Sequence, residues 1–155
     1  MRIIFFAILS GVASGLLIDT EHMVVPGVLF AAAVVLGSYA RFHKVGLLRV
    51  LSFTALSVAA NVAAVQLAMS LSSPGGHDDW LVGGAAGLVG STILGIAMRL
   101  CFRMTPALKT ILSFALVGTA AGAVFFYLPQ PWMAYAIWQA LIGALIARHF
   151  TKRAA

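Results

Sequence analysis

The chain consists of long apolar runs separated by short polar segments. Five stretches contain no Asp, Glu, Lys or Arg, at positions 3–18, 23–40, 50–76, 80–98 and 110–147. A helix that crosses a membrane needs about 20 apolar residues, with a range of about 17–25. The last run is long enough for two such helices. Pro129 and Pro131 divide it, because two prolines around one polar residue cannot continue a helix.

The apolar residues are continuous within each run, whereas the strands of a membrane barrel alternate in polarity. We therefore predict an all-α polytopic membrane protein, a single domain over 1–155 that forms a bundle of six transmembrane helices. The last two helices are expected over 110–128 and 132–147. Met1, Arg2 and the apolar residues after them also resemble a signal peptide. Because the run continues to position 18, we expect the first helix to be retained.

The composition narrows the class of protein. Of the 155 residues, 62% are apolar and 9% are charged, whereas a soluble globular chain is about half apolar and about a quarter charged. So few charges cannot cover a water-facing surface, which excludes a soluble enzyme. The sequence also contains no nucleotide-binding loop, no nucleophile-elbow motif and no zinc-helix motif. We therefore predict no enzyme activity and no cofactor.

The charged residues give the predicted bundle two different sides. All ten basic residues fall on one side: Arg2, Arg41, Lys44, Arg49, Arg99, Arg103, Lys109, Arg148, Lys152 and Arg153. All four acids fall on the other: Asp19, Glu21, Asp78 and Asp79. Cytoplasmic loops carry the excess of Lys and Arg. This predicts a protein of the bacterial cytoplasmic (inner) membrane with both termini in the cytoplasm. The basic residues behind the net charge of +6 then anchor the span ends to the headgroups of the lipid bilayer, and the charge does not indicate nucleic-acid binding.

Small residues form faces on three of the predicted helices. Such faces let helix backbones approach closely, which promotes helix association in lipid. They comprise Gly11 and Gly15, then Gly83, Gly87, Ser91 and Gly95, and then Gly118 and Gly122. The pattern Gly-x-Ala-x-Gly opens the small-residue face of both the first and the fourth predicted span. The second and the fifth span both begin shortly after a proline, Pro26 and Pro106. A 3+3 inverted repeat is therefore a further hypothesis about the architecture.

Few polar side chains lie in the middle of the predicted spans, and none of them is Asp, Glu, Lys, Arg or His. Ion-coupled pumps usually place ionisable residues in the membrane interior, so a pump of that kind is disfavoured. Asn61 and Gln139 lie near mid-span, and Ser57 and Tyr135 precede them by one helical turn. These side chains either form hydrogen bonds between helices or line the path of a small solute.

Two loops on the acidic side contain groups that bind divalent metal ions elsewhere. Carboxylates and imidazoles are ligands for zinc and related ions. The candidates are Asp19, Glu21 and His22 in one loop, and His77, Asp78 and Asp79 in the other. Their spacing matches no specific metal motif, so ordinary solvated acidic loops are the competing interpretation.

The leading functional hypothesis is a small-solute transporter or channel that no intramembrane carboxylate drives. Its substrate pathway is expected at Asn61, Gln139, Ser57 and Tyr135. The alternative is a non-catalytic membrane subunit or scaffold whose glycine faces bind partner helices, in a homo-oligomer or a larger membrane complex. A cavity that reaches Asn61 and Gln139 favours transport, whereas a glycine face exposed to lipid favours the subunit.

Overall fold

The computed structural model describes residues 2–17, 23–38, 46–72, 79–102, 107–125 and 127–151. Regular structure in these ranges is helical throughout: α1 (Arg2–Leu17), α2 (Val25–Gly37), α4 (Leu47–Leu71), α5 (Asp79–Phe102), α6 (Ala107–Phe125) and α7 (Pro131–Thr151). The all-α class predicted from the sequence is confirmed. Three helices are long and apolar enough to cross a membrane, over Leu47–Leu71, Asp79–Phe102 and Leu108–Phe125. Helices α1 and α2 are apolar but shorter.

Local sequence explains several of the helix ends. Pro26 stands in the first turn of α2, where a missing N–H group leaves no helical hydrogen bond unmade. Helix α7 begins at Pro131, so α6 and α7 are separated at the two-proline segment, as the sequence predicts. Helix α5 extends beyond Met98 to Phe102 and includes Arg99. An arginine fits there because its long side chain can extend toward the polar interface from the end of an apolar helix.

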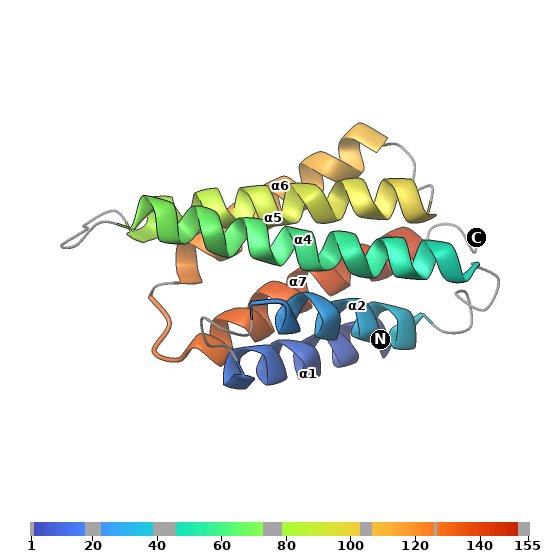
Figure 1. Cartoon of the computed structure of the whole chain (residues 1–155), viewed down its shortest axis with the longest axis horizontal. Helices are drawn as coiled ribbons and strands as arrows, with labels where there is room; N and C mark the ends of the chain where they lie inside the picture. The colour runs from blue at the N-terminus through green and yellow to red at the C-terminus, as the bar shows by residue number, and fades with distance from the viewer. Residues whose placement is uncertain are drawn as a thin grey trace.

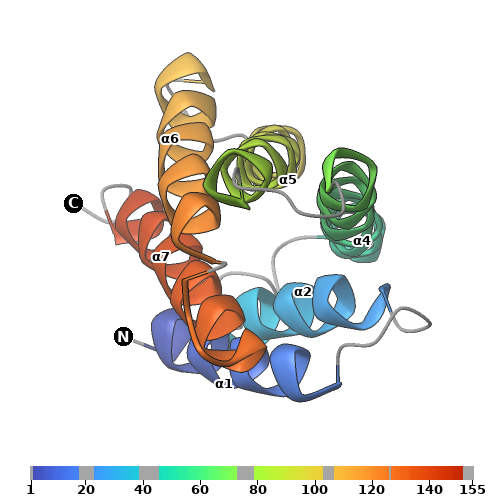
Figure 2. The ribbon, with the colours of Figure 1, turned by 90° about the vertical axis from the view of Figure 1, so that its left-hand side faces the viewer.

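The six helices form a closed ring, shown end-on in Figure 2. Each helix packs against its neighbours in sequence, and α7 returns to pack against α1. Figure 1 shows that consecutive helices run in alternating directions, so α1 begins and α7 ends at the same end of the bundle. We call this the basic end, because it contains Arg2, Arg49, Arg99, Lys109 and Arg148. Asp79 begins α5 at the opposite end, which we call the acidic end.

Large apolar side chains fill the ring in the half nearest the basic end. They include Phe53, Leu94, Met98, Phe102, Phe114, Ile142 and Ile146. The outside of the ring is also apolar, since the side chains of Leu48 and Leu116 are 77% and 71% exposed. Extensive exposed apolar surface marks contact with a membrane or another protein. Together with the three long apolar helices, it indicates a membrane protein.

The glycine faces are buried between helices of the same chain. A Cβ atom on Gly87 would overlap the carbonyl oxygen of Gly118, and one on Gly122 would overlap that of Gly83. At a second tight contact, Gly11 and Gly15 lie against the backbone of α7. Gly95 lies against α6, where a Cβ would be 3.1 Å from the Cα of Ile111. On α2, a Cβ on Gly27 would be 2.5 Å from the Cα of Val58 on α4, and one on Gly37 would be 2.6 Å from the Cα of Ile3 on α1. Close backbone approach therefore joins α5 to α6, α1 to α7, α2 to α4 and α1 to α2.

Candidate functional site

A cavity of about 510 Å³ lies in the half of the ring nearest the acidic end. Four helices line it: α4 with Ala60, Asn61, Ala64, Val65, Ala68, Met69 and Ser72, α5 with Gly83, Ala86 and Gly87, α6 with Gly122 and Phe125, and α7 with Tyr135 and Trp138. Along α4 the lining extends from Ala60 to Ser72, about 18 Å at 1.5 Å per residue. Because Ser72 follows the last turn of α4, the cavity reaches the acidic end.

Side-chain size explains where the cavity lies. On α4, Ala60, Ala64 and Ala68 recur every fourth residue and so share one face of the helix. Opposite them, α5 presents Gly83 and Gly87. In the other half of the ring, the same two helices present Phe53 and Met98, both fully buried. Small side chains thus leave space toward the acidic end, and large ones close it toward the basic end.

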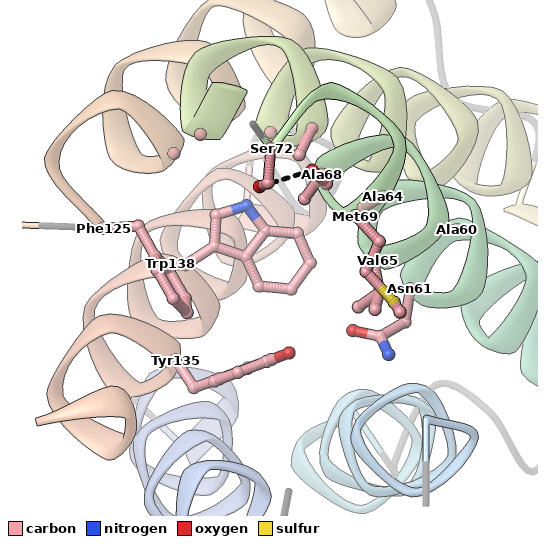
Figure 3. Close-up of a pocket in the computed structure, with 14 residues that line it drawn as sticks. Ala60, Asn61, Ala64, Val65, Ala68, Met69, Ser72, Phe125, Tyr135 and Trp138 are labelled. Atoms are coloured by element: carbon pink, nitrogen blue, oxygen red, sulfur yellow. Dashed lines mark hydrogen bonds between the residues drawn. The ribbon is translucent and has the colours of Figure 1, made fainter. Parts of the chain in front are cut away.

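Two polar groups face this mainly apolar space. Asn61 donates a hydrogen bond from Nδ2 to the carbonyl oxygen of Met23, at 2.6 Å, and its Oδ1 points toward the cavity (Figure 3). The hydroxyl of Tyr135 points toward Asn61 from the opposite wall (Figure 3). Within the described residues, neither Asn61 Oδ1 nor the Tyr135 hydroxyl has a hydrogen-bond partner. The cavity therefore offers one acceptor and one group that both donates and accepts.

Three aromatic side chains form the wall that faces α4. They are Phe125, Tyr135 and Trp138. The indole Nε1 of Trp138 donates to Ser91 Oγ on α5 at 3.2 Å, and its ring lies 5.9 Å from that of Phe30 on α2. The rings of Phe125 and Tyr135 contact each other edge to face, with centroids 5.5 Å apart. Contacts with α2 and α5 therefore hold Trp138 in place, and Phe125 and Tyr135 support each other.

The other two residues of the predicted pathway lie between helices rather than at the cavity. Gln139 is fully buried between α7 and α1, where it accepts a hydrogen bond from Ser10 Oγ and donates one from Nε2 to Ser14 Oγ at 3.2 Å. Ser57 is buried between α4 and α2 and donates to the carbonyl oxygen of Gly27 at 2.9 Å. The structure thus brings Asn61 and Tyr135 together and places Gln139 and Ser57 elsewhere, as links between helices.

The predicted metal ligands fall almost entirely outside the described residues. This holds for Asp19, Glu21, His22, His77 and Asp78, and only Asp79 is described, as the first residue of α5. Among the described residues, no group of three His, Cys, Asp or Glu side chains comes together as a metal site would require. Cys101, the single cysteine, is buried near the basic end with a free thiol.

Several cavity residues were missed by sequence reasoning. The aromatic wall and the alanine face of α4 gave no signal on their own, since such residues are common in membrane helices. The repeat of Ala60, Ala64 and Ala68 was visible in the sequence. Its meaning depends on which helices surround α4, and that follows only from the ring.

Comparisons with protein-family models, with curated proteins and with solved structures find no match. A functional proposal for this chain therefore depends on the cavity itself.

Proposed function

We propose that this protein is a six-span transporter for small, uncharged, partly apolar solutes. The observation that carries the proposal is the cavity, which reaches the acidic end and stops at the buried core of Phe53, Met98 and Phe114. A binding site accessible from one side only is what a carrier presents in one of its two states, with the site between helices near the middle of the membrane. The filled basic half favours a carrier over an open channel.

The polar groups on the cavity wall can replace hydrogen bonds that a solute loses when it leaves water. A solute with an amide or hydroxyl group crosses lipid slowly, because losing its hydrogen bonds to water costs about 2–7 kcal/mol. Asn61 Oδ1 and the Tyr135 hydroxyl replace part of those bonds inside an apolar space. Among the described residues, the lining contains no charged side chain, so these residues offer an ion nothing to offset its much larger desolvation cost.

The orientation we propose follows from the two ends. The basic end faces the cytoplasm of a bacterial inner membrane, since Lys and Arg are retained on that side, and the cavity then faces outward. The helices of the ring lie along one direction (Figure 1), and α1 and α2, at 16 and 13 residues, are shorter than the 25-residue α4. The alternation of helix direction around the ring supports six spans. The 3+3 inverted repeat is not part of the proposal. The glycine face of α1 packs on α7, whereas that of α5 packs on its sequence neighbour α6, so the two faces do not have equivalent partners.

The alternative function as a scaffold has less support. It relied on glycine faces that remain available to partner helices, and Gly11, Gly15, Gly83, Gly87, Gly118 and Gly122 are occupied by helices of this chain. A partner would instead meet the leucine-rich exterior, which also suits lipid.

Uptake of radiolabelled benzamide by proteoliposomes tests the proposal. Vesicles that contain the protein should take up this neutral ring amide faster than protein-free vesicles. Tyr135→Phe removes one cavity hydroxyl that makes no hydrogen bond within the described fold, and should slow the protein-dependent uptake about three- to tenfold. Tyr127→Phe is the matched control, because Tyr127 is exposed and is not among the residues that line the cavity. Uptake equal to that of protein-free vesicles would reject transport of this solute class.

A further inference from the structure

The indole of Trp138 forms a fixed flat surface inside the cavity. Its only donor is already engaged by Ser91 Oγ at 3.2 Å, and Phe30 supports the ring from the side of α2. A tryptophan whose N–H group is satisfied can offer a ligand only its ring, and ring faces and edges favour stacked or edge-to-face aromatic partners. Figure 3 shows the Trp138 ring between α7 and the lining residues of α4.

The wall opposite Trp138 is aliphatic, and most of its side chains project little into the cavity. It is formed by Ala64, Val65, Ala68 and Met69 of α4. Alanine side chains project little, and a methionine side chain is flexible enough to adapt to an irregular neighbour. An aromatic face opposite such a wall suits a flat apolar body rather than a bulky or heavily hydroxylated one.

The two polar groups line the same cavity and point toward each other (Figure 3). Asn61 Oδ1 accepts hydrogen bonds, and the Tyr135 hydroxyl directed toward it both donates and accepts. A carboxamide matches the pair, because its N–H group can donate to Asn61 while its carbonyl accepts from Tyr135. A hydroxyl group can also satisfy either partner. A carboxylate has no donor for Asn61 and would find no counter-charge among the described lining residues.

From this arrangement we propose that the cavity binds an uncharged aromatic compound that carries one carboxamide or hydroxyl group. The ring lies against Trp138, and the polar group lies between Asn61 and Tyr135. The proposal rests on the transport function above only in using the same cavity, and it names the class of molecule that the cavity takes.

Quenching of tryptophan fluorescence by a brominated ligand tests the proposal directly. The protein contains three tryptophans, so Trp80→Phe with Trp132→Phe leaves Trp138 as the single reporter. Trp132→Phe with Trp138→Phe leaves Trp80, which is 47% exposed at the acidic end and outside the cavity. Bromine quenches indole only at short range, so Trp80 measures ligand dissolved in lipid or detergent. Para-bromobenzamide should quench Trp138 saturably and Trp80 only in linear proportion to its concentration.

Three matched ligands separate the physical contributions. Bromobenzene has the ring without a polar group, and para-bromobenzoate has the ring with a negative charge. We expect para-bromobenzamide to bind about three- to tenfold more tightly than bromobenzene, as one or two net hydrogen bonds predict. Para-bromobenzoate should show no saturable quenching. Tyr135→Phe in the single-Trp138 protein should reduce the preference for the amide, whereas Tyr127→Phe should leave it unchanged.

Several results would overturn the proposal. Equal affinity for bromobenzene and para-bromobenzamide would show a merely apolar space, of the kind that a lipid chain fills. Tight binding of para-bromobenzoate, or equal quenching of Trp80 and Trp138, would do the same. If the double Trp→Phe variants fail to fold, the shift in melting temperature of the unmodified protein with each ligand gives the same ranking.

The binding test and the uptake test fail independently. Selective quenching of Trp138 without protein-dependent uptake of benzamide retains the ligand site and rejects transport. Uptake without saturable quenching retains transport and rejects this ligand class.

Discussion

The polar side chains of this protein divide into two groups, according to whether a helix or the cavity faces them. Gln139 and Ser57 are buried and hydrogen-bonded to neighbouring helices. Asn61 Oδ1 and the Tyr135 hydroxyl face the cavity and have no partner within the described residues. An unsatisfied polar group in apolar surroundings costs about 1–3 kcal/mol. The first group therefore stabilises the bundle, and the second favours a bound solute or water.

Replacement of Gln139 by leucine tests this division at the level of single residues. Gln139→Leu removes two hydrogen bonds and leaves Ser10 and Ser14 unpaired between α1 and α7. We expect a loss of about 1–2 kcal/mol in stability, given that a hydrogen bond between membrane helices contributes about 0.6 kcal/mol on average and an unpaired group costs more. The readout is the melting temperature in detergent. Gln66→Leu, the same change at an exposed position, should alter it little. Equal melting temperatures for the two variants would contradict a structural role for Gln139.

The sequence alone could not separate Asn61 from Gln139. Both are amides near the middle of an apolar run, and both were predicted to line one pathway. The difference lies in what faces them. Helix α1 presents Ser10 and Ser14 to Gln139, one turn apart, whereas the alanine face of α4 leaves Asn61 beside open space. That contrast depends on contact between the first and last helices, which no local pattern specifies.

Close backbone contact is the main interaction that holds the helices together. Lipid provides no hydrophobic drive between helices, so association depends on packing and on hydrogen bonds between them. Helices α5 and α6 meet where Gly87 lies against Gly118 and Gly122 against Gly83. Helices α1 and α7 meet at Gly11 and Gly15, beside the hydrogen bonds of Gln139. Gly27 and Gly37 make comparable backbone contacts from α2 to α4 and to α1. Four helix pairs of the ring are thus joined by glycine, and the cavity opens where α4 faces α7.

Two glycines in the same helix give a matched test of this packing. Gly87→Ala places a methyl group onto the carbonyl of Gly118, and backbone atoms cannot move aside cheaply. We expect it to destabilise the protein by about 1–3 kcal/mol, as overpacking does. At Gly84 a Cβ would be 3.7 Å from its nearest neighbour, Thr119 Cγ2, which is ordinary contact. Gly84→Ala should therefore be neutral or stabilising by up to about 1 kcal/mol, because alanine favours the helix.

The measurement for this pair is again the melting temperature in detergent. If Gly84→Ala lowered it as much as Gly87→Ala, loss of glycine in general, rather than the contact with α6, would explain the effect. If neither change had an effect, the α5–α6 contact would be looser than the structure indicates.

At the level of helices, the sequence predicted much of what the structure contains. The uncharged runs located the helices, and Pro129 and Pro131 predicted the separation of α6 from α7. The ends were less accurate. Helix α4 begins at Leu47 and ends at Leu71, whereas the uncharged run covered 50–76. The run could not show this shift, because Arg49 is compatible with the first turn of a helix at the interface and uncharged residues after Leu71 need not be helical.

At the scale of the whole molecule, the ring has two unlike halves. The interior of the basic half is filled by large apolar side chains, with a second pocket of about 510 Å³ between α4 and α5 beside Arg49 and Leu100, and the acidic half contains the cavity that reaches Asn61. The charges of the described helix ends follow the same division, with basic residues at one end and Asp79 at the other. If the basic end faces the cytoplasm, the cavity faces outward, and the direction from which a solute first meets Asn61 and Tyr135 is fixed.

The sidedness of the helix ends tests this orientation. In a Cys101→Ser background, single cysteines at Val24, Ser72 and Tyr127 mark three connections at the acidic end, and one at Gly46 marks the basic end. Intact cells treated with a membrane-impermeant thiol reagent should label the first three, and Gly46→Cys should react only after permeabilisation. Gly46 suits the purpose because nothing lies within 4 Å of a Cβ built there. Labelling of Gly46→Cys and Ser72→Cys from the same side would mean that α4 does not cross the membrane. A full reversal would keep the six spans but turn the cavity toward the cytoplasm, and the solute would then be one that the cell exports or releases.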